Sequence, residues 1–231
     1  MFIRGIRRVA AVAVVIGCLA LAACAMPVTS APEQAASPSA GQVVVAFYGD
    51  SYTRGAGASS PEQRWSSIVS AQRGWAEFNP SVDGLGFVTK RDYVTGVGDD
   101  LVDLIVEHEP APEIVIVTMG LNDNFVMPAQ ADDIEAAIDA DLERFRAELP
   151  DARLIVVEPF WYQDERPASV EQIIDWVEAA ADRVGADYIA GASRWIEGHP
   201  EWMSIDTVHP NDDGYDEIAR RMDEELAQLG L

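Results

Sequence analysis

Cysteine and positive charge are both scarce in this sequence. The chain has two cysteines, and it has only 16 lysine and arginine residues against 39 aspartate and glutamate residues. Its formal net charge of −23 disfavours binding to nucleic acid, because the phosphates would repel it. Hydrophobic residues make up 48% of the chain and charged residues 24%, which is typical of a globular protein and not of a disordered or fibrous one. We therefore expect one sizeable folded domain and no nucleic-acid partner.

The longest apolar run near the amino terminus is too short to be a comfortable membrane span. Three arginines precede the run Val9 to Ala23, whereas a transmembrane helix needs about 20 apolar residues. This pattern is typical of a secretory signal peptide. The run ends in Leu21-Ala22-Ala23-Cys24, which resembles the lipobox of bacterial lipoproteins. The resemblance implies cleavage before Cys24 and lipidation of that cysteine.

Cysteine usage supports the lipoprotein interpretation. The other cysteine, Cys18, lies in the segment that would be removed, so the mature chain would have no disulfide and one thiol. Acylation would consume that thiol, and two or more acyl chains hold a protein stably at a membrane surface. An ordinary signal peptide with an incidental Cys24 is the alternative. We expect an exported protein, anchored to the outer face of the cell membrane, with residues 1–23 removed and a net charge of 13 − 39 = −26.

Bulky apolar side chains are almost absent from residues 25–41, which are rich in Pro, Ser, Ala, Thr and Gln. Residues 24–41 are therefore expected to form a flexible tether, and residues 42–231 the folded domain. Within that domain, short and continuously apolar runs rich in β-branched residues are typical of strands buried on both faces. These runs are Val43 to Tyr48, Glu113 to Met119 and Arg153 to Glu158, and two weaker strands are expected at Trp75 to Asn79 and Asp187 to Ile189.

Segments with helical periodicity alternate with these strands. The alternation predicts an α/β fold with a mostly parallel five-stranded sheet and helices on both faces. In such sheets the functional groups gather in loops at the carboxyl ends of the strands. A capping-box pattern of Ser169 with Gln172 opens one of the helices. The expected helices are Glu62 to Gln72, Gly98 to Glu107, Asp132 to Leu149, Ser169 to Val184 and Gly214 to Leu229.

The residues needed for ester cleavage occur at expected strand ends. Ser51 directly follows the first strand, and Gly49 lets the backbone turn sharply there. Asp206 precedes His209 by three residues, so a turning loop can bring the carboxylate to Nδ1 while Nε2 faces the serine. A nucleophile, a base and a carboxylate that orients the base are the parts of a serine hydrolase. The sequence therefore indicates a serine ester hydrolase with Ser51, His209 and Asp206 as its catalytic residues.

Three hydrogen-bond donors at strand ends could converge on the oxygen that becomes negative during ester cleavage. They are the backbone N–H groups of Ser51 and Gly84 and the side-chain amide of Asn122. Position alone leaves Gly86, Gly96 and Gly98 open as alternatives to Gly84.

Four segments resemble, in order, the sequence blocks of the SGNH hydrolases, also called GDSL-type esterases/lipases. They are Gly49-Asp50-Ser51, Asn79 to Gly84, Gly120-Leu121-Asn122-Asp123 and Asp206 to Pro210, within a resemblance that covers about Val43 to Leu229. It implies a flavodoxin-like three-layer α/β/α fold, a triad of Ser51, His209 and Asp206, an oxyanion hole of Ser51, Gly84 and Asn122, and no metal or cofactor. Tyr52 stands where the family name has leucine, a variation expected to leave the chemistry untouched.

Three function classes follow from these residues. The first is hydrolysis of esters of small acyl groups, with acetylated carbohydrate at the cell surface as a candidate substrate. A metal-dependent phosphoesterase is the second, because Asp50, Asp123, Asp206 and His209 are plausible ligands of a hard metal ion. The third is a surface binding module whose catalysis has lapsed, which the intact catalytic residues oppose.

Four further features have both a functional and an ordinary interpretation. We expect His108 to interact with a helix dipole and with its acidic neighbours. His199 is expected to be the weaker base, because the residue three positions before it is Ile196 and not a carboxylate. Gly55 to Ala58 is interpreted as a mobile loop beside the site. The aromatic residues Trp161, Tyr162, Trp195 and Trp202 could form a floor for a sugar or acyl group, and core packing explains them equally well.

Overall fold

The structure is a computed structural model, and its described part comprises residue 39, residues 41–91 and residues 100–231. The expected signal peptide at residues 1–23, Cys24 and nearly all of the expected tether lie outside the described residues, as do Gly96 and Gly98. Among the residues that are described, no helix has the length and apolar character needed to cross a membrane.

Five strands of the described domain form one sheet, in the order β2-β1-β3-β4-β5. All four pairings between neighbouring strands are parallel, so the sheet is entirely parallel where the sequence predicts a mostly parallel one. The α/β class and all five expected strands are confirmed. The bounds are β1 Val44–Tyr48, β2 Ala76–Phe78, β3 Ile114–Val117, β4 Arg153–Val157 and β5 Asp187–Ile189.

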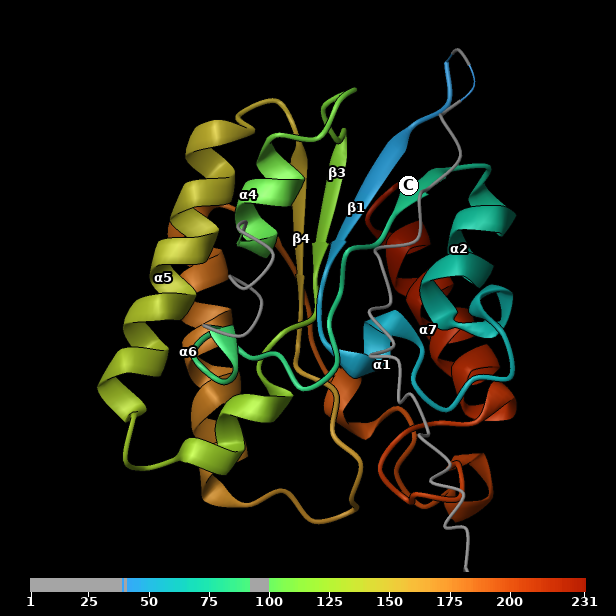
Figure 1. Ribbon diagram of the computed structural model, residues 1–231, viewed down its shortest axis with the longest axis vertical. Coiled ribbons are helices and arrows are strands. Elements are labelled where there is room, and N and C mark those ends of the chain that lie inside the picture. Colours follow the sequence, from blue (N-terminus) through green and yellow to red (C-terminus); the bar gives the residue numbers. More distant parts are fainter. Residues whose placement is uncertain (1–38, 40, 92–99) are drawn as a thin grey trace, which may run out of the picture. The chain divides into compact units, whose positions relative to one another are not determined.

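Helices cover both faces of this sheet, which gives three layers (Figure 1). Successive strand residues point to opposite faces, so Val45 and Phe47 pack with α2 and α7, whereas Ala46 and Tyr48 pack with α4 and α5. The β-branched strands are buried on both sides for this reason. The helix bounds are α2 Trp65–Arg73 and α7 Asp212–Gln228 on one face, and α4 Leu101–Val106, α5 Ala131–Glu148 and α6 Ala168–Val184 on the other.

The expected capping box at Ser169 is wrong. Helix α6 begins one residue earlier, after Pro167, and the Ser169 hydroxyl donates to Asn124 Oδ1 at 2.5 Å, so it is not free to cap the helix. A capping box occurs instead at the start of α4, where Asp100 and Asp103 exchange side-chain and backbone hydrogen bonds.

Short helical turns lie between the strands and the longer helices. Two of them contain residues that the sequence analysis assigned to the site: α1 begins at Ser51, and η3 includes Asn122. Their bounds are α1 Ser51–Arg54, η1 Pro61–Gln63, η3 Leu121–Val126, η4 Ala192–Arg194 and η5 Pro200–Trp202.

Candidate active site

The turn after β1 carries Ser51 as the first residue of α1. Asp50 caps this short helix, since its carboxylate accepts a hydrogen bond from the Tyr52 N–H at 2.9 Å. Glycine is required at position 49, because a Cβ atom there would lie 2.5 Å from the side-chain oxygens of both Thr53 and Thr118. The Gly-Asp-Ser sequence therefore makes a tight turn that presents Ser51 at the end of the strand.

A loop before α7 carries the other two expected catalytic residues. An antiparallel bridge between Met203 and Pro210 closes the loop. Thr207 adopts a positive φ of 59°, which is uncommon for a residue other than glycine. This turn reverses the chain between Asp206 and His209 and brings their side chains to the same side.

The structure brings Ser51, His209 and Asp206 into one hydrogen-bonded line. His209 Nε2 lies 2.9 Å from Ser51 Oγ, and His209 Nδ1 lies 2.7 Å from Asp206 Oδ2. The second carboxylate oxygen, Oδ1, accepts hydrogen bonds from the Ser204 hydroxyl at 2.8 Å and from the backbone N–H groups of Val208 and His209, both at 2.9 Å. Both oxygens of Asp206 are therefore engaged, and the imidazole is held at both nitrogens.

The charge on Asp206 determines which nitrogen of His209 carries a proton. Partial burial raises the pKa of Asp206, but the hydrogen bonds from His209, Val208 and Ser204 outweigh it and hold that pKa well below its ordinary value. An ionised carboxylate can only accept, so His209 Nδ1 carries a proton and donates it. Nε2 is then the acceptor for the Ser51 hydroxyl, as a general base requires.

The structure describes all three of the expected oxyanion donors. In the described part of the chain, the backbone N–H groups of Ser51 and Gly84 have no hydrogen-bond acceptor. The Asn122 amide donates to Asp50 Oδ2 at 3.2 Å and to the Leu85 carbonyl at 2.9 Å. These two bonds tie the end of β3 to the turn before Ser51 and to the residue after Gly84, so the three segments meet.

The geometry separates the two candidate glycines that are described. Gly84 has a φ of 74°, a left-handed conformation that favours glycine, and its N–H is available. The N–H of Gly86 donates to the Thr89 carbonyl at 2.9 Å, so it is already engaged. Gly96 and Gly98 lie outside the described residues.

Asp123 holds the segment that follows Gly84, a function that the sequence reasoning missed. Its carboxylate accepts hydrogen bonds from the backbone N–H groups of Phe87 at 2.7 Å and of Val88 and Thr89 at 3.0 Å. Burial raises the pKa of Asp123, and these N–H groups oppose that rise. The Asn-Asp pair was visible in the sequence, but nothing in it indicated which backbone segment the carboxylate binds.

The carboxylates proposed as metal ligands are engaged by N–H donors. Asp50 accepts from Tyr52 and Asn122, Asp123 accepts from a backbone turn, and Asp206 accepts from its own loop. Within residues 41–91 and 100–231, no three His, Cys, Asp or Glu side chains gather as a metal site. The N–H donors around these carboxylates therefore indicate that the carboxylates hold backbone and side-chain groups in place, which fits the contacts better than metal coordination does.

The glycines after α1 allow a close approach between the two halves of the site. Gly57 has a φ of 92°, and a Cβ atom there would lie 2.4 Å from the Pro210 carbonyl oxygen and 3.2 Å from His209 Cβ. The expectation that Gly55 to Ala58 lies beside the site matches this contact. The structure also gives the reason for glycine at this position, since any side chain would push against the loop of the base.

The four aromatic residues divide between core and partly buried positions. Trp161 and Trp195 are 2% and 5% exposed and belong to the core, so packing explains them. Tyr162 and Trp202 are partly buried and pack against the same cluster. An aromatic floor made by all four residues is therefore wrong.

The other two histidines have partners different from those expected. His108 Nδ1 lies 2.8 Å from the Pro110 carbonyl oxygen, and not on an acidic neighbour. His199 does have a nearby carboxylate, Glu201, at 2.8 Å, and its ring stacks on Trp202 at 3.6 Å. Of the three histidines, His209 is the one that lies beside Ser51.

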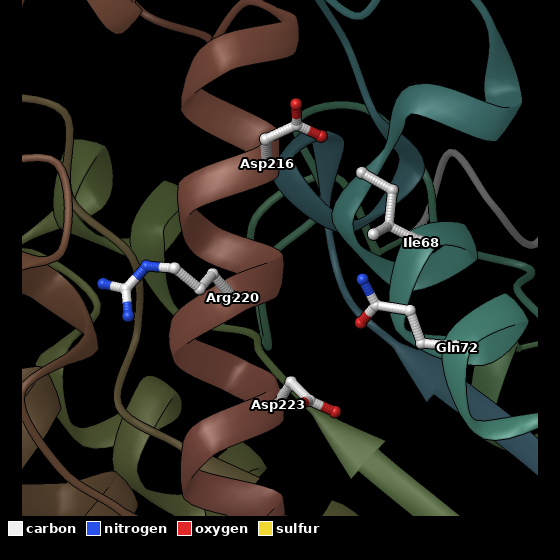
Figure 2. A pocket seen from close by; sticks show the side chains of 5 residues that line it. All are labelled: Ile68, Gln72, Asp216, Arg220 and Asp223. Carbon is white, nitrogen blue, oxygen red and sulfur yellow. The ribbon is translucent and has the colours of Figure 1, made fainter.

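A surface hollow of about 620 Å³ lies between α2 and α7 (Figure 2). None of the side chains lining it takes part in the site at Ser51. The guanidinium of Arg220 is bonded to Glu217 and Glu224, and Asp223 is paired with Arg73. The lining residues are Ile68, Gln72, Asp216, Arg220 and Asp223.

Comparisons with known proteins match nearly the whole described domain. The sequence model of the GDSL-like Lipase/Acylhydrolase family matches residues 47–217. The GDSL lipase Rv0518 of Mycobacterium tuberculosis is 27% identical over 185 residues, which make up 77% of this chain and 79% of that protein.

Solved structures share the fold at low sequence identity. The psychrotrophic esterase EstA from Pseudoalteromonas sp. superposes with a TM-score of 0.62 at 15% identity, over 80% of this chain and 97% of that one. Est24, a carbohydrate acetylesterase from Sinorhizobium meliloti, superposes with a TM-score of 0.60 at 17% identity, over 81% of this chain and 100% of that one. These likenesses show the fold.

Proposed function

The chain belongs to the GDSL-like lipase/acylhydrolase family, the SGNH hydrolases, and is a carboxylic ester hydrolase; we propose that it cleaves its substrate with a triad of Ser51, His209 and Asp206. One observation carries the proposal. Ser51 Oγ lies 2.9 Å from His209 Nε2, and His209 Nδ1 lies 2.7 Å from an Asp206 carboxylate that is held ionised. This is the arrangement that activates a serine hydroxyl.

The proposed reaction has two acyl-transfer steps. Ser51 Oγ attacks the ester carbonyl carbon while His209 Nε2 takes the hydroxyl proton, and Asp206 stabilises the imidazolium that forms. The N–H groups of Ser51 and Gly84 stabilise the oxyanion, and the amide of Asn122 joins them by exchanging its longer hydrogen bond, at 3.2 Å to Asp50 Oδ2, for one to the oxyanion. The imidazolium then gives its proton to the departing alkoxide, which leaves an acyl-enzyme. Water activated by His209 releases the acid and restores Ser51.

The proposed substrates are esters of small acyl groups, with acetylated carbohydrate as the first class to test. The similarity to Est24, described as a carbohydrate acetylesterase, supports this choice. Tyr162 and Trp202, which are partly buried in segments after β4 and β5, offer aromatic surface of the kind that packs against sugar rings.

The decisive experiment compares the wild type with Ser51→Ala on nitrophenyl esters of increasing chain length and on acetylated sugars. We expect the variant to lose at least about 10³-fold in kcat, and the acetyl esters to be the best substrates. Ser70→Ala is the matched control, because it removes a buried hydroxyl that has no partner among the described residues.

Two further measurements separate the serine mechanism from metal catalysis. A fluorophosphonate should label Ser51 and abolish activity, and a chelator should leave activity unchanged. Loss of activity on chelation, together with no reaction toward the fluorophosphonate, would instead favour the metal-dependent phosphoesterase.

We also propose that the enzyme is exported and held at the outer face of the cell membrane by a lipid on Cys24. The basic and apolar segment that ends in Leu21-Ala22-Ala23-Cys24 supports this proposal. We expect Cys24→Ala to block processing or to release the protein from the membrane fraction, and Cys18→Ala to behave as the wild type. Processing and detergent-dependent membrane retention that persist in Cys24→Ala would refute the anchor.

A further inference from the structure

Tyr52 follows the proposed nucleophile directly and reaches the loop that carries the proposed base. The residue is fully buried, and its hydroxyl donates to the Val208 carbonyl oxygen at 2.6 Å. Val208 is the neighbour of His209 in the chain. One side chain thus joins the turn of the nucleophile to the backbone beside the base.

The ring of Tyr52 is fixed by aromatic neighbours. It stacks on Phe160 with a centroid separation of 5.6 Å and an interplanar angle of 18°. The same ring lies against the imidazole of His209 at 6.0 Å, tilted by 50°. Because the ring has little freedom, its hydroxyl points to one place on the base loop.

The base loop has the internal hydrogen bonds that define its shape, but few that place it against Ser51. The 203–210 bridge and the bonds to Asp206 lie within the loop itself. In the described part of the chain, two hydrogen bonds connect residues 51–54 with residues 204–209. They are the bond between Ser51 and His209 and the bond from Tyr52 to Val208.

The Tyr52 bond differs from the Ser51 bond in one functional respect. The bond between Ser51 and His209 must break and re-form during every turnover, because the proton moves along it. The Tyr52 bond takes no part in proton transfer, and burial raises the pKa of Tyr52 well above its ordinary value, so the hydroxyl remains a donor. It can hold the loop in register while the other bond changes.

We propose that Tyr52 is a positioning residue, whose hydroxyl sets the distance between His209 and Ser51 by anchoring the Val208 carbonyl. This inference rests on the proposed triad. It concerns kcat and not substrate binding, because Tyr52 holds the base and is covered by the protein. Small displacements of a catalytic group have large effects on rate, since a shift of about 1 Å can cost about 10²-fold.

The test is Tyr52→Phe, which keeps the ring and removes the hydroxyl. We expect kcat to fall about tenfold with KM unchanged. The downfield proton resonance of His209 Nδ1–H should shift or broaden, because the electron density of the imidazole depends on the bond between Nε2 and Ser51, which the displaced loop would weaken. A merely structural change would not move this resonance.

Tyr48→Phe is the matched control. Tyr48 is also fully buried, and its hydroxyl donates at the same distance of 2.6 Å, to Asp141 Oδ2 on the other face of the sheet. We expect this variant to lose thermal stability while its kcat and its His209 resonance match the wild type.

The outcomes separate this inference from the proposed function. If Ser51→Ala retains activity, the proposed function itself fails. If Ser51→Ala is inactive while Tyr52→Phe keeps kcat within twofold of the wild type, or loses it only to the extent that Tyr48→Phe does, the positioning role is refuted and the triad stands.

Discussion

The Asp206 carboxylate uses its two oxygens differently, and this division predicts the effect of Asp206→Asn. Oδ1 accepts three hydrogen bonds, from Ser204, Val208 and His209 N–H, whereas Oδ2 faces His209 Nδ1. An asparagine would keep its single oxygen among the three donors and turn its NH₂ group toward Nδ1. The proton would then move to Nε2, the nitrogen that must accept from Ser51. We expect kcat to fall by about 10³- to 10⁴-fold.

Steady-state kinetics on a nitrophenyl ester would measure this change, and Ser204→Ala provides the comparison. That variant removes one of three donors to Oδ1 and leaves the carboxylate in place, so we expect a loss of only a few-fold. A loss in Asp206→Asn no greater than in Ser204→Ala would contradict the tautomer argument.

Gly57 predicts a second effect at the level of one residue. In Gly57→Ala the new methyl group would meet the Pro210 carbonyl oxygen at 2.4 Å, and the φ of 92° would be strained as well. Gly74→Ala is a matched control, because its φ of 68° is also positive but no atom lies within 4 Å. We expect backbone strain to cost both variants about 1 kcal/mol in the free energy of unfolding, and only Gly57→Ala to lose further stability through the clash and to lose kcat as well. Equal kcat values in the two variants would show that the contact with the base loop is unimportant.

The turn of residues 86–89 depends on a single side chain from another element. Asp123 accepts three backbone N–H groups in it, and an asparagine at that position would present an NH₂ group to some of these donors. We expect Asp123→Asn to lose about 1–3 kcal/mol in the free energy of unfolding and about tenfold in kcat, because the neighbouring Gly84 N–H would no longer be held in place. Urea unfolding, kinetics and amide exchange at Val88 and Thr89 would measure these effects.

Asp83→Asn is the control for this element. Asp83 lies in the same segment, but its carboxylate is 49% exposed and pairs with Arg54 at the surface, so its removal should cost little. If the two variants exchange their amide protons equally fast at Val88 and Thr89, the Asp123 carboxylate does not hold this turn.

The strands and the layer order were predictable from the sequence for a simple reason. Each strand of a parallel sheet is buried on both faces, so β3 has the sequence Ile-Val-Ile-Val. Such a continuous apolar run can be recognised without knowing what the strand packs against. The expected catalytic residues could also be located, because the carboxyl ends of parallel strands lie at one edge of the sheet.

Features that depend on a distant partner could not be predicted in this way. Ser169 fits a capping box locally, but its hydroxyl binds Asn124, 45 residues away. From the sequence, tyrosine in place of leucine at position 52 was expected to leave the chemistry untouched, yet its hydroxyl donates to the carbonyl of Val208, 156 residues later. Local patterns contain helix and strand signals, whereas the partner of a buried polar group is a property of the folded chain.

The molecule carries a large negative charge, and one of its carboxyl groups, that of Asp50, is buried inside the domain. Asp50 is 1% exposed, and burial raises its pKa from 3.8 to about 7, with Asp123 and Asp83 adding to the rise. A carboxyl whose pKa is raised in the folded state stabilises that state when protonated, and this contribution is lost as the pH rises toward 7. Groups with lowered pKa values act elsewhere. The pKa of Asp206 lies well below its ordinary value and that of Glu217 falls to about 2, so these two carboxylates lose their contribution only below about pH 4.5.

The enzyme should therefore become more stable as the pH falls from 8 to 5.5. One proton taken up on folding corresponds to about 1.4 kcal/mol per pH unit, and each 1 kcal/mol raises Tm by about 2–4 °C in a domain of this size. Repulsion among surface carboxylates, at a net charge of −23, has the same sign. Salt separates the two causes, because about 1 M salt reduces the Debye length to about 3 Å and screens the surface but not a buried group. We expect the Tm increase to persist in high salt for the wild type and to be largely lost in Asp50→Asn; an equal increase in both proteins would assign the effect to surface charge.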